Sequence, residues 1–362
     1  MKATVGSEVQ SYRTSMAPTG VPRVMRETHR YLLPTLESWG AELVPVKTSE
    51  RSETEGRHVD PYVGSDPVLA RNFRWPEDVD LLLLLNPSTA IDFTRLVRVR
   101  RTRRLPIIAM INDLLPVRHP EWFPEGADLH YRVLFQQILH VADHVVLPSS
   151  HVLDDLKDLG WSVRPQLHVI HLGSSFEQRP PREMKGEVCE LLYVSTLAPR
   201  KGHLRLLEAF DQLRASGLPV RLTLVGRVGW EVDDLLAVLR DHPELGESLR
   251  WLPNADDEQV AELLAECTVA VVPAEGEGFG LFVEEALTAG VMVVATDLPV
   301  FRERPNRNLI LCEGSVEGLA SAIREACQRR PQVLAAGEVR SMRDFAEDLA
   351  SLVRDSMDAG AG

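Results

Sequence analysis

The sequence predicts an α/β protein built from two doubly wound domains that follow one another along the chain. Three observations lead to this prediction. The chain has 362 residues, enough for two domains of ordinary size. Short apolar segments alternate with segments of helical pattern throughout, which is typical of mostly parallel sheets. A polar, Pro-rich segment at 173–187 predicts a linker between the two halves.

The first half, residues 1–174, is expected to form the N-terminal domain. Its predicted strands are short apolar segments bounded by polar or turn-forming residues. They are 41–46, 80–85, 106–112, 144–149 and 166–172. Helical patterns at 131–144 and 150–160 lie between the later strands.

The second half, residues 175–339, repeats the alternation and is expected to form the C-terminal domain. The predicted strands are 189–195, 221–226, 248–253, 269–273 and 291–297. The predicted helices are 203–217, 230–242, 257–267, the segment leading to Gly290, and 315–330. Open parallel sheets bind ligands beyond the carboxyl ends of their strands, so we expect the site in the cleft between the two domains.

Charge and hydropathy limit the classes of partner. A net charge of −13 opposes binding to nucleic acid and disfavours, without forbidding, contact with an anionic membrane. The apolar run at 80–91 is too short to span a bilayer, and the N-terminus lacks the apolar core of a signal peptide, so we expect a cytoplasmic protein.

One segment runs against the overall charge, because residues 95–104 contain six arginines. The plainer interpretation is the solvated C-terminal end of a surface helix, where the helix dipole favours cations. The alternative is a docking surface for an acidic or lipid-linked acceptor.

The four cysteines are far apart in the sequence. Without a C-x-x-C pair or histidines at ligand spacing, neither a zinc site nor a disulfide framework is indicated. We expect ordinary thiols at Cys189, Cys267, Cys312 and Cys327.

The stretch AEGEGFGLFVEEALTAG, residues 274–290, carries the strongest chemical signal. It follows a predicted strand, contains Gly276, Gly278 and Gly280, and continues into a helical pattern that ends at Gly290, a C-cap candidate. Glycine-rich backbone and a helix N-terminus can hold a phosphate without any basic side chain.

Two common nucleotide motifs do not fit this stretch. A P-loop needs Gly-Lys-Ser/Thr where the chain has Gly280, Leu281 and Phe282. A dinucleotide fingerprint needs a glycine where Leu281 stands, although Asp297 is placed to serve as its acid. Fewer than 90 residues remain after this point, too few for a dinucleotide fold that begins here.

Two acids in this stretch suggest a ligand other than those of a P-loop or a dinucleotide fold. Glu277 lies in the loop and Glu285 eight positions later, in the helix. A carboxylate can accept two hydrogen bonds from neighbouring hydroxyls of a sugar. A nucleoside diphosphate sugar has such hydroxyls on both of its sugars and a diphosphate between them. The stretch therefore predicts a sugar-nucleotide site.

These residues resemble a known family. EGFGLFVEEAL is similar to the signature of family 4 (group 1) retaining glycosyltransferases of the GT-B fold, in which two Rossmann-like domains face each other across a cleft. Further similar segments are 194–210, 222–230, 19–24, 112–124 and 142–150. The resemblance covers nearly the whole chain and is closest in kind to bacterial mannosyl- and related hexosyltransferases.

The resemblance implies roles for the C-terminal domain. Glu277 would bind hydroxyls of the donor sugar and Glu285 the ribose, while Lys201 and Arg200 would neutralise the leaving diphosphate, where charge grows in the transition state. Backbone amides would come from Gly278, Phe279, Gly280 and Leu281. No metal or other cofactor is expected.

The resemblance also implies roles nearer the acceptor. Asp113 would orient substrate beside Asn112, which replaces a histidine of many relatives; Asp113 as a turn former remains an alternative. Thr196 stands where many relatives have arginine, and Gly20 is what remains of a glycine loop, or simply opens a helix. The last helix, 340–357, would pack back on the N-terminal domain.

The sequence thus predicts a bacterial enzyme that transfers a hexosyl unit to a glycan, a lipid-linked acceptor or a small natural product. Arg outnumbers Lys, which suggests a GC-rich genome. A non-catalytic sugar-nucleotide-binding partner subunit remains the alternative, favoured by Thr196 and Asn112. A dehydrogenase would bind nicotinamide, which we do not expect.

Overall fold

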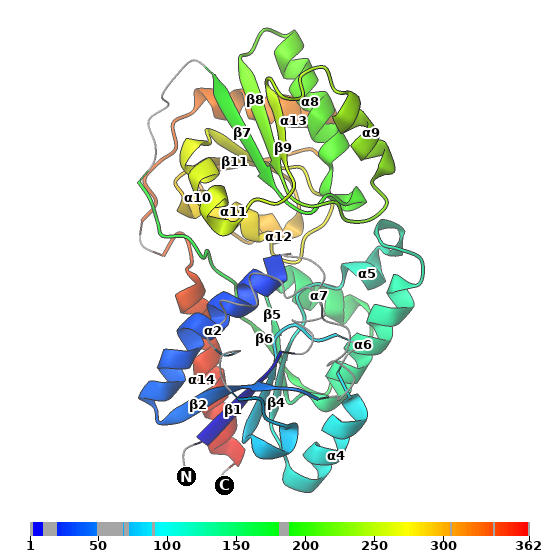
Figure 1. The fold of residues 1–362 in the computed structure, drawn as a ribbon, viewed down its shortest axis with the longest axis vertical. Coiled ribbons are helices and arrows are strands. Elements are labelled where there is room, and N and C mark those ends of the chain that lie inside the picture. Colours follow the sequence, from blue (N-terminus) through cyan, green and yellow to red (C-terminus); the bar gives the residue numbers. More distant parts are fainter. Residues whose placement is uncertain are drawn as a thin grey trace. The chain divides into compact units, whose positions relative to one another are not determined.

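The computed structural model describes residues 3–9, 20–48, 68, 72–88, 91–180, 188–304, 306–335 and 337–360. These residues form two compact units, each built on its own six-stranded parallel sheet (Figure 1). The first unit comprises 1–118, 126–172 and 342–362; the second comprises 119–125 and 173–341. The sequence analysis included 119–125 in the N-terminal domain, whereas the segment clusters with the second unit.

The first unit has the strand order β2-β1-β3-β4-β5-β6. The strands are β1 (Ala3–Glu8), β2 (Ala41–Val46), β3 (Leu81–Leu84), β4 (Ile107–Met110), β5 (His144–Leu147) and β6 (Gln166–Val169). All five predicted strands are confirmed: β2 has its predicted bounds, and the other four are somewhat shorter. The four leucines of β3 are fully buried, which explains their unbroken apolar run in a sheet covered on both faces.

Strand β1 was not predicted, because ATVGSE has only two apolar side chains among its six residues. It nevertheless pairs with both β2 and β3. A Cβ on Gly6 would lie 2.4 Å from Val46 Cγ2, so the crowded sheet interior requires a residue with no side chain at this position.

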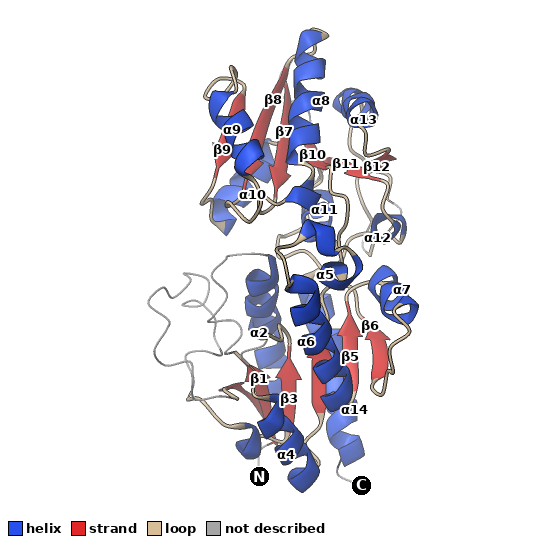
Figure 2. Cartoon of the chain, turned by 90° about the vertical axis from the view of Figure 1, so that its right-hand side faces the viewer, coloured by secondary structure: helices blue, strands red, loops and turns tan. Residues whose placement is uncertain are grey.

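Helices cover both faces of this sheet (Figure 2). They are α2 (Gly20–Ser38), α4 (Phe93–Arg103), α5 (Leu115–Arg118), α6 (Ala127–Val141), α7 (Ser150–Asp158) and α14 (Met342–Gly360). The C-terminal helix α14 returns to this unit and packs against α2. Its fully buried residues, Phe345, Ala346, Leu349, Ala350 and Val353, recur at the spacing of one helix face.

The arginine-rich segment 95–104 lies on α4, whose C-terminal end leads into the start of β4. That end is therefore at the amino edge of the sheet, away from the edge where parallel sheets bind ligands. Arg95 pairs with Glu77 at 2.9 Å and Arg100 with Asp143 at 2.5 Å. The remaining arginines of the segment are exposed. This geometry fits the solvated end of a surface helix.

The second unit has the strand order β12-β11-β10-β7-β8-β9. The strands are β7 (Cys189–Val194), β8 (Val220–Val225), β9 (Leu249–Leu252), β10 (Val269–Val272), β11 (Met292–Thr296) and β12 (Leu309–Cys312). The helices are α8 (His203–Ala215), α9 (Asp233–Asp241), α10 (Asp257–Glu266), α11 (Leu281–Thr288), α12 (Pro299–Arg302) and α13 (Val316–Gln328). Every strand and helix predicted for this half is confirmed. Helix α12 and the half-buried edge strand β12 were not predicted.

The order of these strands decides where a ligand can bind. The chain builds outward from β7 through β8 to β9, and then returns to place β10 on the other side of β7. This reversal is a topological switch point, where the loops after two adjacent strands diverge and leave a crevice. The loops after β7 and β10 therefore frame the expected site.

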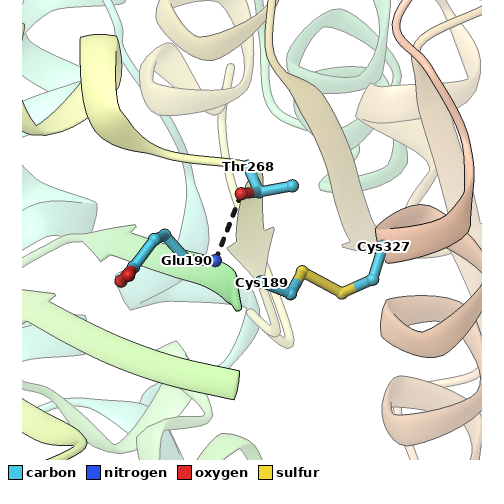
Figure 3. The surroundings of a disulfide bond; sticks show 4 residues. All are labelled: Cys189, Glu190, Thr268 and Cys327. Atoms are coloured by element: carbon cyan, nitrogen blue, oxygen red, sulfur yellow. Dashed lines mark hydrogen bonds between the residues drawn. A yellow bond between two sulfur atoms is a disulfide. The ribbon is translucent and has the colours of Figure 1, made fainter. Parts of the chain in front are cut away.

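Two of the cysteines form a disulfide, so the prediction of four ordinary thiols is wrong for them. Cys189 at the start of β7 bonds Cys327 near the end of α13, with Cα atoms 5.9 Å apart (Figure 3). The pair is separated by 138 residues along the chain, and only packing α13 against the sheet brings the two sulfurs together. Cys267 and Cys312 remain thiols.

Candidate active site

The loops after β7 and β10 meet at the switch point of the second unit. Lys201 Nζ lies 2.5 Å from Glu277 Oε1, and Arg200 Nη1 lies 3.7 Å from Glu277 Oε2. The backbones are also joined, because Glu275 N donates to Arg200 O at 2.8 Å and Arg200 Nη1 donates to Gly276 O at 2.8 Å. Of the four residues predicted to be catalytic, Glu277, Lys201, Arg200 and Asp113, the first three are thus brought together, whereas Asp113 follows β4 in the first unit.

A short turn presents the two cations. Pro199–Lys201 form one 3₁₀ turn, and Gly202 follows with φ of 69°, a left-handed conformation that favours glycine. A Cβ on Gly202 would lie 2.1 Å from the carbonyl oxygen of Pro273, so this close approach of the two loops needs glycine. The buried Tyr193 hydroxyl donates to Lys201 O at 3.0 Å and so holds the end of this turn against β7.

The site carries fixed charges of both signs. The side chains of Arg200, Lys201 and Glu277 are only 12%, 13% and 14% exposed. Burial raises the pKa of Glu277, but the charges of Lys201 and Arg200 outweigh it and hold this pKa below its ordinary value. Glu277 is therefore ionised at neutral pH, and the three side chains together have one excess positive charge. Such a site attracts an anion while keeping an acceptor for hydroxyls.

The glycine loop enters α11 in the predicted manner. Gly280 has φ of 78° and is the residue from which α11 begins. A Cβ there would lie 2.3 Å from the Phe301 ring, so both conformation and space demand glycine. The first amides of a helix have no acceptor within it, which leaves those at the start of α11 suited to an anion. The helix stops before Gly290 as predicted, although Ala289 is its C-cap residue and Gly290, with φ of 75°, is the left-handed residue that follows.

Both acids of α11 are buried. Glu285, the predicted ribose ligand, has an exposed fraction of 0%. Glu284 is 4% exposed; its Oε2 binds Arg304 Nη1 at 3.1 Å and its Oε1 accepts from Arg340 N at 2.7 Å. The sequence analysis missed Glu284 and Arg304. An acid in so apolar a helix as LFVEEALT was the available signal, since a buried carboxylate needs a cation or donors.

Of the remaining predicted residues, three lie on loops that follow strands and one begins a helix. Thr196 follows β7 in the second unit. Gly20 is the first residue of α2 in the first unit, and Asn112 and Asp113 follow β4 there. Asp113 Oδ1 accepts from Leu115 N at 3.1 Å, which is the geometry of the turn-forming alternative. Partial burial, with the charge of Asp113, raises the pKa of the nearby Tyr131.

An aromatic cluster that the sequence analysis did not select borders Arg200. The Arg200 guanidinium lies 5.9 Å from the Phe123 ring, which stacks on Trp230 at 5.6 Å. Trp230 Nε1 donates to Trp122 O at 2.9 Å. Glu231 has φ of 52°, and α9 starts after it, at Asp233, rather than at Trp230 as predicted. The interruption keeps the Trp230 ring out of the helix and within this cluster.

Two negative searches apply to the described part of the chain. Among those residues, no group of three or more His, Cys, Asp and Glu side chains is arranged to hold a metal ion. Within the same ranges, none of the helices combines the length and apolar content that crossing a bilayer requires.

Comparison with known proteins finds a family model that matches the C-terminal part of the chain. Residues 174–344 match the model of the family described as glycosyl transferases group 1. The serotype-specific mannosyltransferase WbdA of Escherichia coli is 33% identical over 213 residues, which are 54% of this chain and 26% of WbdA. Glycogen synthase of Mycobacterium tuberculosis is 26% identical over 252 residues, which are 67% of this chain and 60% of that enzyme. The chain thus spans about a quarter of the length of WbdA.

Solved structures give the fold. Anabaena HepE, in complex with UDP and glucose, has a TM-score of 0.66 at 16% identity, over 99% of this chain and 98% of HepE. Sucrose-phosphate synthase from Thermosynechococcus elongatus has a TM-score of 0.68 at 17% identity, over 99% of this chain and all of that one. With its two parallel six-stranded sheets, the chain has the GT-B fold, as predicted.

Proposed function

We propose, from the premise that residues 174–344 belong to the glycosyl transferases group 1 family, that this chain is a retaining hexosyltransferase. It would transfer a sugar from a nucleoside diphosphate sugar to a hydroxyl of a glycan, a lipid-linked acceptor or a small natural product in the cytoplasm. The single observation that carries the proposal is the contact of Lys201 and Arg200 with an ionised Glu277 at the switch point.

The chemistry proposed for this contact follows from its charges. The diphosphate gains negative charge as the bond to the sugar breaks, and the preorganised cations Lys201 and Arg200 stabilise that charge. Glu277, being ionised, accepts hydrogen bonds from hydroxyls of the donor sugar. When the donor is bound, Lys201 would share its hydrogen bonds between Glu277 and the phosphate oxygens.

The surrounding residues receive supporting roles. Backbone amides at Gly278, Phe279, Gly280 and Leu281 would bind the diphosphate, with Thr196 at the edge of the same loop pair. Glu285 would bind the ribose, which requires its fully buried carboxylate to become accessible when the donor enters. In the first unit, Gly20, Asn112 and Asp113 would contact the acceptor.

The relatives suggest which donors to test first. WbdA is named a mannosyltransferase, which favours a GDP- or other activated mannose. The HepE complex contains UDP and glucose, which makes UDP-glucose the second choice. Because the two cations already supply the charge that a metal would supply, we propose that transfer needs no metal; unchanged turnover in excess EDTA is the expected result.

The test has two stages. A thermal-shift panel of GDP-, UDP-, dTDP- and ADP-sugars identifies the donor, since a ligand that binds only the folded state raises the melting temperature. Release of free nucleoside diphosphate is then measured for the wild type and for Glu277→Ala. We expect the variant to fold and to lose release, and near-normal turnover in it would refute the role of Glu277.

A non-catalytic partner subunit is the second candidate, favoured by Thr196 and Asn112 at positions where many relatives have charged or titratable side chains. It predicts donor binding without nucleoside diphosphate release for every acceptor tried. Release by the wild type that disappears in Glu277→Ala would exclude it.

A further inference from the structure

Arg304 lies behind the glycine loop and is largely buried, with a side chain that is 15% exposed. Its guanidinium stacks on the ring of Phe279 at 3.9 Å from the centroid. Nη2 donates to the carbonyl oxygen of Phe279, and Nη1 donates to Glu284 Oε2 at 3.1 Å. One planar group thus contacts a ring, a backbone carbonyl and a carboxylate at once.

The contact with the Phe279 carbonyl determines where the next amide points. A trans peptide places C=O and N–H on opposite sides of the bond, so a carbonyl held toward Arg304 turns the Gly280 N–H away from Arg304. The left-handed φ of Gly280 and the Phe301 ring packed against its Cα hold this conformation from the other end. The orientation of one loop amide is therefore set by a side chain 24 positions later in the sequence.

Glu284 anchors the guanidinium in turn. The charges of Glu284 and Arg304 compensate each other in a buried place where neither is stable alone. Glu284 Oε1 also accepts from Arg340 N at 2.7 Å, and Arg340 O accepts from Ser174 N at 2.7 Å. Residues 174 and 340 lie where the chain enters and leaves the second unit. The Arg304–Glu284 pair is thereby linked by hydrogen bonds to both of these segments.

We infer that Arg304 is a positioning residue of the donor site, which holds the 276–280 loop so that the Gly280 amide faces the diphosphate. This inference rests on the proposed function. Its chemical basis is the planar fork of arginine, which reaches a carbonyl and a carboxylate together, whereas a lysine ammonium has no such geometry.

The test compares Arg304→Lys with Arg302→Lys in the purified full chain. Arg302 is a matched control, because it lies two residues away and makes an exposed pair with Asp297 at 2.6 Å. Binding of the nucleoside diphosphate and of the bare nucleoside is measured by titration calorimetry, and donor KM and kcat by nucleoside diphosphate release. UDP and uridine, or GDP and guanosine, are the probes, according to the donor panel.

We expect Arg304→Lys to weaken nucleoside diphosphate binding about tenfold, the size of one misdirected hydrogen bond to a charged group. The donor KM of Arg304→Lys should rise, while its affinity for the nucleoside should not change. Arg302→Lys should keep the wild-type values of all three quantities. A general loss of stability would lower the affinity for both ligands equally. The ratio of the two affinities therefore reports the positioning of the loop.

Glu284→Gln provides a second variant if Arg304→Lys fails to fold, since its amide cannot accept from both Arg304 and Arg340 N. It should shift the affinity ratio in the same direction. If the wild type binds the diphosphate and a folded variant keeps the wild-type ratio, the inference is overturned and the proposed function stands. A wild type that binds no nucleoside diphosphate overturns both.

Discussion

Lys201 Nζ lies 2.5 Å from Glu277 Oε1, although the two residues are 76 positions apart in the sequence. The contact exists because β7 and β10 are neighbours in the sheet, so that the loops after them share one crevice. It places an ionised acid beside two cations at the point where an open parallel sheet binds its ligand.

Glu277→Gln should separate binding from turnover. Removing the carboxylate charge raises the net positive charge beside the diphosphate, so affinity for nucleoside diphosphate should be equal to or higher than that of the wild type. Turnover should fall about 100-fold or more, because the donor sugar loses its ionised partner in the transition state. Calorimetry and product release measure the two effects; parallel losses in both would contradict this assignment.

Lys201→Met should have the opposite effect on binding. Without the ammonium, Glu277 faces the diphosphate with less compensation, and affinity for nucleoside diphosphate should fall about tenfold or more, as for a lost hydrogen bond to a charged group. The same titration measures it. An unchanged affinity would show that the diphosphate does not approach Lys201.

Gly280→Ala should destabilise the second unit by about 2–4 kcal/mol, from the left-handed backbone and the overlap with Phe301 together. Gly246→Ala is the control: its φ is 92°, but no atom lies within 4 Å of the added Cβ, so only the backbone term of about 1–2 kcal/mol applies. Urea denaturation compares the two. Equal losses would mean that Phe301 moves aside.

Stability should fall as the solution is acidified from pH 7 to 5. Burial lowers the pKa of His203 to about 3, from an ordinary value of 6.5. The unfolded chain therefore binds a proton below pH 6.5 that the folded chain does not, and this residue alone should remove about 2 kcal/mol at pH 5. In His203→Gln the fall should be smaller by that amount; identical pH profiles for the two proteins would contradict the assignment.

Reduction of the Cys189–Cys327 disulfide should lower the melting temperature of the second unit. A link between residues 138 positions apart restricts the unfolded chain strongly, and its loss typically removes about 2–5 kcal/mol. Cys189→Ala/Cys327→Ala should melt low with or without dithiothreitol, whereas Cys312→Ala should keep the redox dependence of the wild type. A melting temperature indifferent to dithiothreitol in the wild type would contradict the bond.

The sequence alone determined the features that depend on neighbouring residues. Alternating apolar and helical segments predicted the doubly wound units, because parallel strands buried on both faces need unbroken apolar runs. The glycines at 280 and 290 were recognisable because a strand–loop–helix with two left-handed turns is a local pattern. Glu277 could be proposed from the sequence because its position within that pattern is local too.

The tertiary structure decided the features that depend on which strands and helices become neighbours. β1 became an interior strand because it pairs with both β2 and β3, and Cys189 met Cys327 through the packing of α13. Arg304 reached Phe279 and Glu284 because α12 lies beside the start of α11 in space. No spacing in the sequence encodes such contacts: they follow from the order in which strands join the sheet, and that order is fixed only when the whole core packs.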